Sequence, residues 1–388
     1  MQILNHAVHL EEVSKQQALS SRPNKQLKVA IVGGSNSVMR DGYTKYLQEY
    51  ISSETDDSLE LDYFAMGGVT SLFGAIQNCR HDIAKNHDVI FFEYCVNDRA
   101  AFTRGKYTPR MAGMALEGFI RQAKSANPQC IIIIVIFGTN LPSFYNNCCF
   151  ISAVYESIAR RYEIPVINLT EILLQRRGFK FIKRLYGKSD TVHFERPRGT
   201  KIVGEAIAEQ VVARQLFQTQ PKQLDRSPRM YAGNLQDLKF FSDFSALSKA
   251  NEIKTEVFKN HFFEEEIHTI RNESSINLKL KGRLLGIMIK SDWYDGLVKI
   301  RHGNQEIITS SFSTWIIKEG KSNINLLGLP YQKFSKCNAF RDLSISLCQE
   351  DRQGYELDMR KKEPEVDCHQ WKLSIIGIAY TGELKTAV

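Results

Sequence analysis

Five short apolar runs in the first half of the chain constrain its fold more than any other feature of the sequence. Most of them are apolar throughout rather than alternating with polar residues, and they are rich in Val, Ile and Phe. Strands that are buried on both faces of a parallel sheet have this pattern. The predicted strands are Lys28–Val32, Leu59–Ala65, Asp88–Phe92, Cys130–Phe137 and Pro165–Leu169.

Amphipathic stretches separate or follow these runs and are predicted to be helices. Strands that alternate with helices favour a doubly wound α/β fold, because each helix returns the chain to the next parallel strand. The predicted helices are Asp41–Ile51, Ser71–Asn86, Thr108–Ala126, Asn147–Tyr162 and Gly199–Leu216.

A second domain follows from the length of 388 residues, which is too long for one ordinary core. Residues Thr219–Arg229 hold two prolines and many polar side chains, as linkers do. Short β-like stretches dominate beyond them and predict an antiparallel β-sandwich. We therefore expect a polar segment at 1–26, an α/β domain at 27–220 and a β-sandwich domain at 230–388. The predicted β stretches are Ser275–Leu280, Arg283–Ser291, Leu297–His302, Glu306–Ser311, Ile324–Leu329, Leu343–Cys348 and Trp371–Tyr380.

The net charge of +8 is mildly basic and spread along the chain, which fits an anionic substrate or cofactor but not nucleic acid. The eight cysteines show no regular spacing and no zinc-type pattern, so we expect reduced, buried thiols and no metal. The first residues lack the apolar core of a signal peptide, and the longest apolar run is far below the ~20 residues of a transmembrane helix. These observations predict a soluble, cytoplasmic protein.

Glycines and polar residues follow the carboxyl ends of the predicted strands, where parallel sheets bind ligands. Gly33-Gly34-Ser35 comes after the first strand, Ala65–Gly68 after the second and Glu93–Asp98 after the third. Asp190 and His193 come after the fifth strand and before the last helix. Because these strand ends share one edge of the sheet, we expect their side chains to meet there.

The residue types at this edge suit nucleophilic catalysis. A serine hydroxyl needs a base, which His193 can supply to Ser35, while Asp190 orients the imidazole. A tetrahedral intermediate needs donors aimed at its oxyanion. The backbone N–H groups of Ser35 and Gly68 and the side-chain amide of Asn97 are candidates for that role.

Four sequence blocks at these positions resemble the motifs of the SGNH/GDSL hydrolase superfamily, in order and in spacing. They are Gly33–Ser37, Gly67–Ser71, Cys95–Asp98 and Asp190–His193. The resemblance covers residues 27 to 217. It implies a flavodoxin-like three-layer α/β/α domain, ester chemistry without a metal or tightly bound cofactor, Ser35 as nucleophile, Asp190 and His193 as the base pair, and Gly68 and Asn97 in the oxyanion hole.

Two positions depart from the family pattern. Gly34 stands where the family usually has aspartate, and Cys95 stands where the Gly-x-Asn-Asp block usually opens with glycine. The Gly-Gly-Ser-Asn-Ser variant is similar to that of members associated with bacterial surface polysaccharides, such as capsules, some of which are O-acetyltransferases. The resemblance therefore implies transfer of an acetyl group, with acetyl-coenzyme A as a possible donor, to a polysaccharide or its precursor.

Other interpretations stay open at this point. Ser35 could cap the helix near Asp41, whereas a dinucleotide loop is disfavoured because Ser35 and Val38 stand where its glycines would be. A basic stretch could be a solvated face or a clamp for an anionic substrate or the phosphates of coenzyme A. Aromatic residues of the C-terminal half could stack on sugars or belong to the core. The basic residues are Arg176, Arg177, Lys180, Lys183 and Arg184, and the aromatic residues are Trp293, Tyr294, Trp315 and Trp371.

The alternatives to an acyltransferase are a carbohydrate esterase or deacetylase with the same Ser-His-Asp triad, and a non-catalytic glycan-binding protein with a degenerate hydrolase fold. All of these functions imply a carbohydrate partner. The sequence makes no prediction about the oligomeric state.

Overall fold

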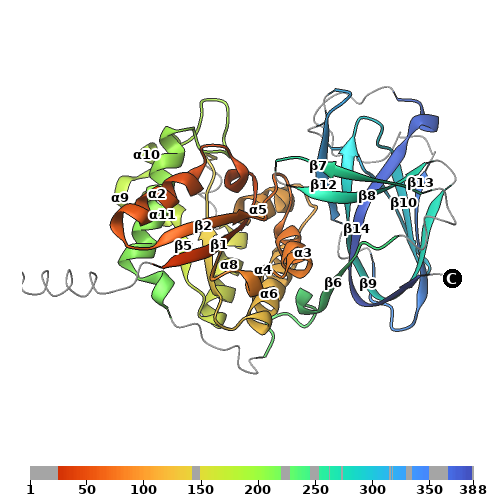
Figure 1. Ribbon diagram of the computed structural model, residues 1–388, viewed down its shortest axis with the longest axis horizontal. Helices are drawn as coiled ribbons and strands as arrows, with labels where there is room; N and C mark the ends of the chain where they lie inside the picture. The colour runs from red at the N-terminus through yellow and green to blue at the C-terminus, as the bar shows by residue number, and fades with distance from the viewer. Residues whose placement is uncertain are drawn as a thin grey trace, which may run out of the picture. The chain divides into compact units, whose positions relative to one another are not determined.

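A computed structural model describes residues 25–141, 149–219, 228–244, 253–261, 263–271, 274–313, 316, 318–328, 334–348 and 366–386. The chain forms two compact units (Figure 1). The first unit is Met1–Gly68, Asp82–Ala100 and Ala123–Pro228, and the second is Val69–His81, Ala101–Gln122 and Arg229–Val388. Nearly all of the predicted 1–26 segment and most of the predicted linker lie outside the described residues. The domain boundaries proposed from the sequence stay a prediction.

The first unit contains a five-stranded parallel sheet with the strand order β2-β1-β3-β4-β5, which is the flavodoxin-like order. The side chains of β3 are all buried, as its continuous apolar sequence predicts. The doubly wound α/β fold is therefore confirmed. The strands are β1 (Gln26–Gly33), β2 (Ser58–Tyr63), β3 (Val89–Glu93), β4 (Ile131–Ile136) and β5 (Val166–Asn168).

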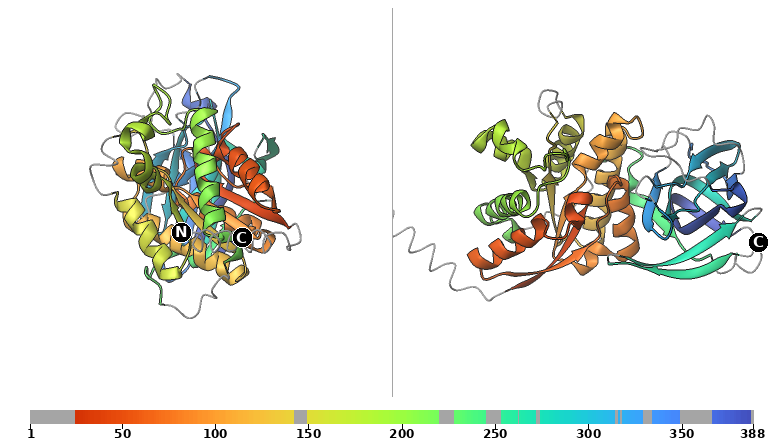
Figure 2. Two further views of the ribbon diagram at one scale, coloured as in Figure 1. Left: turned by 90° about the vertical axis from the view of Figure 1, so that its left-hand side faces the viewer. Right: turned by 90° about the horizontal axis from the view of Figure 1, so that it is seen from above.

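Helices cover both faces of this sheet. Val29 and Ile31 of β1 belong to one core cluster with side chains of α2, α9, α10 and α11, and Figure 2 shows α11 beside α2. On the other face, the ring of Phe92 in β3 lies 6.3 Å from that of Tyr155 in α8. The layers are thus α/β/α. The helices are α2 (Tyr43–Glu54), α4 (Ile83–Asn86), α5 (Cys95–Thr103), α8 (Phe150–Tyr162), α9 (Leu169–Arg177), α10 (Phe179–Lys183) and α11 (Arg198–Ala213), with 3-10 turns η1 (Ser35–Val38) and η2 (Leu216–Gln218).

The second unit is built on antiparallel strands, in the order β11-β10-β13-β9-β14-β8-β7, with β12 paired to β9 and β6 paired to β14. The antiparallel prediction is confirmed. The strands are not split between two unconnected sheets, because β9 and β14 pair with different partners along their length. They are β6 (Leu238–Phe241), β7 (Lys254–Lys259), β8 (Glu264–Arg271), β9 (Ser275–Asp292), β10 (Leu297–His302), β11 (Gln305–Ser310), β12 (Ser322–Gly328), β13 (Arg341–Cys348) and β14 (Lys372–Thr386), with η3 (Leu235–Asp237) and η4 (Cys368–Gln370).

The two strands predicted on either side of Gly282 are one strand, β9. Gly282 pairs with Gly382 of β14, and both have positive φ, 145° and 100°. A Cβ on Gly282 would lie 1.8 Å from the carbonyl oxygen of Thr381. The glycine therefore allows a close approach of two strands and not the turn that the sequence suggests.

Two helices belong to the second unit, wholly or in large part: α3 (Ser71–His81) and α6 (Pro109–Ala126). Polar contacts join them to the C-terminal part of this unit. The fully buried Glu117 of α6 accepts the backbone N–H groups of Met230 and Tyr231 at 2.6 and 2.9 Å. Arg80 of α3 forms an ion pair with Glu265 of β8 at 2.6 Å. Among the described helices, none combines the length and the apolar character needed to cross a membrane.

Candidate active site

The structure brings together the serine, histidine and aspartate that the sequence singles out. Ser35 follows β1 after one residue and begins η1, and its Oγ lies 2.7 Å from Nε2 of His193, which is 158 residues further along the chain. The other ring nitrogen of His193, Nδ1, lies 2.7 Å from Oδ2 of Asp190. This is the hydrogen-bonded order in which a base can take the proton of a serine hydroxyl.

Asp190 is held in place by its own loop. Its Oδ1 accepts the backbone N–H groups of Val192 at 2.9 Å and His193 at 2.8 Å. Partial burial raises the pKa of Asp190, but the hydrogen bonds from these two N–H groups and from the His193 ring outweigh it, so the pKa lies below its ordinary value. An ionised Asp190 accepts Nδ1–H of His193, which leaves Nε2 free to receive a proton.

The predicted oxyanion donors other than Ser35 come from the loop after β2 and from the first turn of α5. A Cβ on Gly67 would be 3.3 Å from Cβ of Ser35, which places this loop against the serine, and Gly68 has a φ of 79° that favours glycine. Asn97 lies in the first turn of α5. The donor roles of Ser35, Gly68 and Asn97 stay predictions.

The unusual Gly34 has a steric explanation. A Cβ at this position would lie 2.2 Å from Oδ1 and 2.8 Å from Cγ of Asn97. The side-chain amide of Asn97 therefore packs directly on the backbone of Gly34, and no aspartate fits there without displacing it. Glycine at position 34, where the family usually has aspartate, is therefore what allows Asn97 to occupy this position.

No protein-family model matches the sequence, and no curated protein matches it. Solved structures do match. A two-domain esterase active on acetylated mannans, co-crystallised with mannopentaose, superposes with a TM-score of 0.62 at 14% identity, over 96% of this chain and 95% of that one. A second structure of a two-domain esterase active on acetylated mannans gives 0.60 at 14% identity over the same shares.

The chain has the SGNH hydrolase fold. The resemblance expected from the four sequence blocks is thus confirmed at the level of the fold. The match to the mannan esterase extends through both units, including the C-terminal strands that the blocks do not reach. An acetyl xylan esterase, AlAXEase, has a TM-score of 0.41 at 19% identity, over 48% of this chain and 100% of that one.

Asn36 is a site residue of this SGNH fold that the sequence reasoning missed. Its side chain is 3% exposed and bridges the backbone on both sides of His193: Nδ2 donates to the carbonyl of Val192 at 3.3 Å, and Oδ1 accepts N–H of Phe194 at 3.4 Å. Asn36 thereby ties the loop that carries the base to the loop that carries the nucleophile. Its place next to Ser35 was the only signal in the sequence.

We expect Asn36→Ala to lower kcat for an acetyl ester by about 100-fold with little change in KM, because a base displaced by about 1 Å loses its alignment while the substrate still binds. Asn36→Asp, which keeps the acceptor for Phe194 but lacks the donor to Val192, should recover part of the rate. Steady-state kinetics check both. Unchanged kcat in a destabilised Asn36→Ala protein would show that the role is structural only.

Glu93 is a second missed residue, buried at the end of β3 beneath the serine loop. Its Oε2 accepts the backbone N–H of Gly34 at 3.3 Å and the hydroxyl of Ser37 at 3.2 Å. Burial raises the pKa of Glu93 to about 8; the bonds from Gly34 and Ser37 lower it, and the charge of Asp98 raises it. The carboxyl supports the backbone that positions Ser35.

A pKa raised on folding makes stability depend on pH. Glu93 has an ordinary pKa of 4.5 when unfolded and about 8 when folded, so its favourable contribution is complete below 4.5 and is lost as pH rises through 8. Each pKa unit corresponds to about 1.4 kcal/mol. The wild type should therefore lose stability between pH 4.5 and pH 8, whereas Glu93→Gln should not lose this contribution. We expect the free energy of unfolding of Glu93→Gln, relative to that of the wild type, to increase by several kcal/mol from the lower pH to the higher. Urea unfolding at both ends of the range measures this, with the exposed Glu49→Gln as control; parallel pH profiles would contradict it.

The basic stretch lies on α9, on α10 and at the residue after α10, and three of its side chains make described contacts within the fold. Arg176 pairs with Glu209 of α11 at 2.9 Å, and both side chains are about half-exposed. Arg177 and Lys183 lie over the rings of Phe181 and Phe179. None of the described contacts joins this stretch to Ser35 or His193. Binding of a substrate or donor by Arg176, Arg177, Lys180, Lys183 and Arg184 stays a prediction.

The aromatic residues proposed as a sugar platform divide into different environments. Trp371 is 4% exposed and packs with Leu297 and Cys348, so it is a core residue. Trp293 and Tyr294 are partly exposed, and Trp315 lies outside the described residues. Sugar stacking is thus excluded for Trp371 and stays a prediction for Trp293 and Tyr294.

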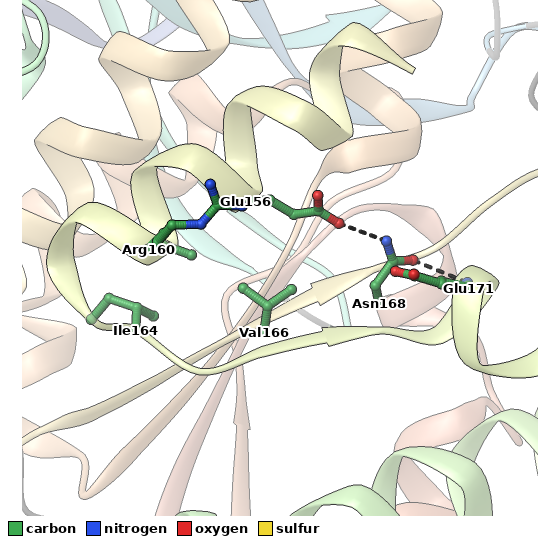
Figure 3. Close-up of a pocket in the computed structure, with 7 residues that line it drawn as sticks. Glu156, Arg160, Ile164, Val166, Asn168 and Glu171 are labelled. Atoms are coloured by element: carbon green, nitrogen blue, oxygen red, sulfur yellow. Dashed lines mark hydrogen bonds between the residues drawn. The ribbon is translucent and has the colours of Figure 1, made fainter. Parts of the chain in front are cut away.

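An open hollow of about 350 Å³ lies beside the edge strand β5 (Figure 3). Within it, the amide of Asn168 donates to Glu156 at 2.8 Å and accepts N–H of Glu171 at 3.2 Å. These polar groups satisfy one another, and no triad residue lines the hollow. We therefore place the candidate active site at Ser35 and not here.

Proposed function

We propose that this protein is a serine-dependent carbohydrate esterase that removes acetyl groups from a glycan. The observation that carries the proposal is the hydrogen-bonded chain from Ser35 through His193 to Asp190, with 2.7 Å at each step. Support for the substrate class comes from the two-domain esterase active on acetylated mannans, whose fold matches nearly the whole chain.

The geometry leads to a two-step reaction. Ser35 Oγ attacks the acetyl carbonyl carbon as His193 Nε2 takes its proton, and Asp190 stabilises the imidazolium. The oxyanion accepts hydrogen bonds from the N–H groups of Ser35 and Gly68 and from the Asn97 amide. His193 then protonates the departing sugar oxygen, which leaves an acetyl-enzyme. Water, deprotonated by His193, attacks the acetyl-enzyme, and acetate and free Ser35 result.

The exposure of the base favours water as the acceptor. The side chains of His193 and Asp190 are 31% and 44% exposed. An acyltransferase has to keep water from the acyl-enzyme. Transfer from acetyl-coenzyme A to a surface polysaccharide, which the Gly33–Ser37 block favours, uses the same acyl-enzyme and differs only in the acceptor. The intact chain of hydrogen bonds disfavours a non-catalytic glycan-binding protein.

The test compares hydrolysis with transfer. The protein is incubated with acetylated mannan and other O-acetylated glycans, and separately with acetyl-coenzyme A and the deacetylated glycans. We expect acetate release from at least one acetylated glycan and no acetylated product in the second reaction, with Ser35→Ala inactive in both. Acetylated glycan in the second reaction, exceeding free acetate, would establish the acyltransferase instead.

A further inference from the structure

Two cysteines lie near the first turn of α5, which also carries the predicted oxyanion donor Asn97. All seven cysteines among the described residues are free thiols. Cys95 begins α5 and is fully buried, and Cys149 is the N-cap of α8 and half-buried. Cys95 Sγ lies 3.3 Å from Oγ of Ser152, which is three residues after Cys149 in the first turn of α8, so the two thiols face each other across this contact and influence each other's acidity.

The same two helices are joined a turn further on. Tyr155 of α8 donates its hydroxyl to Oδ2 of the buried Asp98 of α5 at 2.8 Å. The pairs Cys95–Cys149 and Asp98–Tyr155 thus bracket one tight contact between the first turns of α5 and α8. A bond between the two sulfurs would reinforce a contact that the fold already makes.

The two thiols have opposite acidities. The hydrogen bond from Cys95 lowers the pKa of Cys149 to about 5, against some burial, and the charge of Arg99 lowers it further. The same bond, together with burial, raises the pKa of Cys95 well above its ordinary value. A half-exposed thiolate beside a protonated thiol is the arrangement of an attacked cysteine and its resolving partner. Cys130 differs, because burial raises its pKa to about 12.

We propose that Cys95 and Cys149 form an oxidation site, at which a peroxide converts the two thiols into a disulfide. The Cys149 thiolate attacks one oxygen of hydrogen peroxide and becomes a sulfenic acid, and hydroxide leaves. The Cys95 sulfur then attacks the Cys149 sulfur, and its proton and the sulfenic hydroxyl leave as water. In sum, the two thiols lose two electrons and two protons to one hydrogen peroxide, and one disulfide and two waters form.

The disulfide changes the geometry of the oxyanion site. Its sulfurs are about 2.05 Å apart, closer than two hydrogen-bonded thiols, so the first turn of α5 moves toward α8. Asn97 lies two residues beyond Cys95, packed on Gly34. We infer that oxidation shifts the Asn97 amide and slows the esterase. This second step rests on the proposed function, whereas the oxidation itself does not. It gives a role to Cys95, which replaces the usual glycine.

Mass spectrometry of the whole wild-type protein tests the oxidation site without any activity assay. The protein is treated with hydrogen peroxide, remaining thiols are alkylated, and peptides are mapped without reduction. We expect a Cys95–Cys149 cross-link that dithiothreitol reverses, with Cys130 alkylated. A cross-link from Cys149 to the adjacent Cys148, a sulfinic acid on Cys149 with Cys95 still alkylated, or a Cys149 no more reactive than Cys130 would each overturn the proposal.

Hydrolysis of an aryl acetate tests the consequence. Peroxide should lower the rate of the wild type by up to about 100-fold, the usual cost of losing one oxyanion donor, and dithiothreitol should restore it. Cys149→Ser should keep the untreated rate and resist peroxide, whereas Cys130→Ser should behave as wild type. A cross-linked protein with full activity would overturn the inferred slowing. If the untreated protein showed no hydrolysis, that result would contradict the proposed function. The presence or absence of the Cys95–Cys149 cross-link would still test the oxidation site.

Discussion

Ser35→Ala should lower kcat for hydrolysis of an acetyl ester by about 10⁴- to 10⁶-fold and leave the fold intact. The hydroxyl Oγ is the atom that His193 contacts, at 2.7 Å, and the substitution leaves the serine's Cβ, which packs by Gly67, in place. Without the hydroxyl, only the oxyanion donors and substrate binding still contribute to catalysis. Steady-state hydrolysis of an aryl acetate and of acetylated mannan measures the loss.

A matched serine variant controls for indirect effects. Ser53 is exposed on α2, and its hydroxyl bonds only the carbonyl of Tyr50 in its own helix among the described contacts. Ser53→Ala should keep wild-type activity, and both variants should unfold with the wild-type midpoint. If Ser35→Ala kept substantial activity while folded, Ser35 would be a turn serine and the nucleophile would lie elsewhere.

His193→Ala should cost as much as Ser35→Ala, about 10⁴- to 10⁶-fold in kcat, because neither residue works without the other. The structure gives His193 two partners, Asp190 on Nδ1 and Ser35 on Nε2, each at 2.7 Å. The double variant Ser35→Ala/His193→Ala should therefore be no slower than either single variant. Kinetics of the three proteins measure this.

The exposed His261 in the second unit supplies the control for the histidine variants. His261→Ala should retain full activity. Additive losses in the double variant, reaching the product of the two single losses, would contradict a triad that acts as one unit. Such a result would mean that Ser35 and His193 serve separate steps.

The sequence predicts the parallel sheet because apolar runs such as Cys130–Phe137 can be buried only between two helical layers. A parallel sheet also predicts that Ser35, Asp190 and His193 lie at one sheet edge, because parallel strands share their carboxyl edge. In the structure these three side chains do meet. Periodicity and topology together were sufficient for this part of the candidate site.

Other features depend on contacts between distant residues. α5 follows β3 after a single residue, and nothing in the local pattern separates its first turn from a loop. The role of Asn36 depends on its hydrogen bonds to the backbone of Val192 and Phe194, which are distant in sequence. The role of Glu93 likewise depends on its hydrogen bond with the backbone of the serine loop. The strands β6, β7 and β8 were missed too, since short segments form strands there only by pairing with β14 or with each other.

Mass spectrometry of the protein, quenched with acid during turnover of an aryl acetate, tests the esterase proposal most directly. We expect an acetyl group on the peptide that contains Ser35, absent from Ser35→Ala and from His193→Ala, and discharged when turnover is allowed to finish. Steady acetate release with no acetyl group on Ser35, or an acetyl group on another residue that survives in Ser35→Ala, would contradict it.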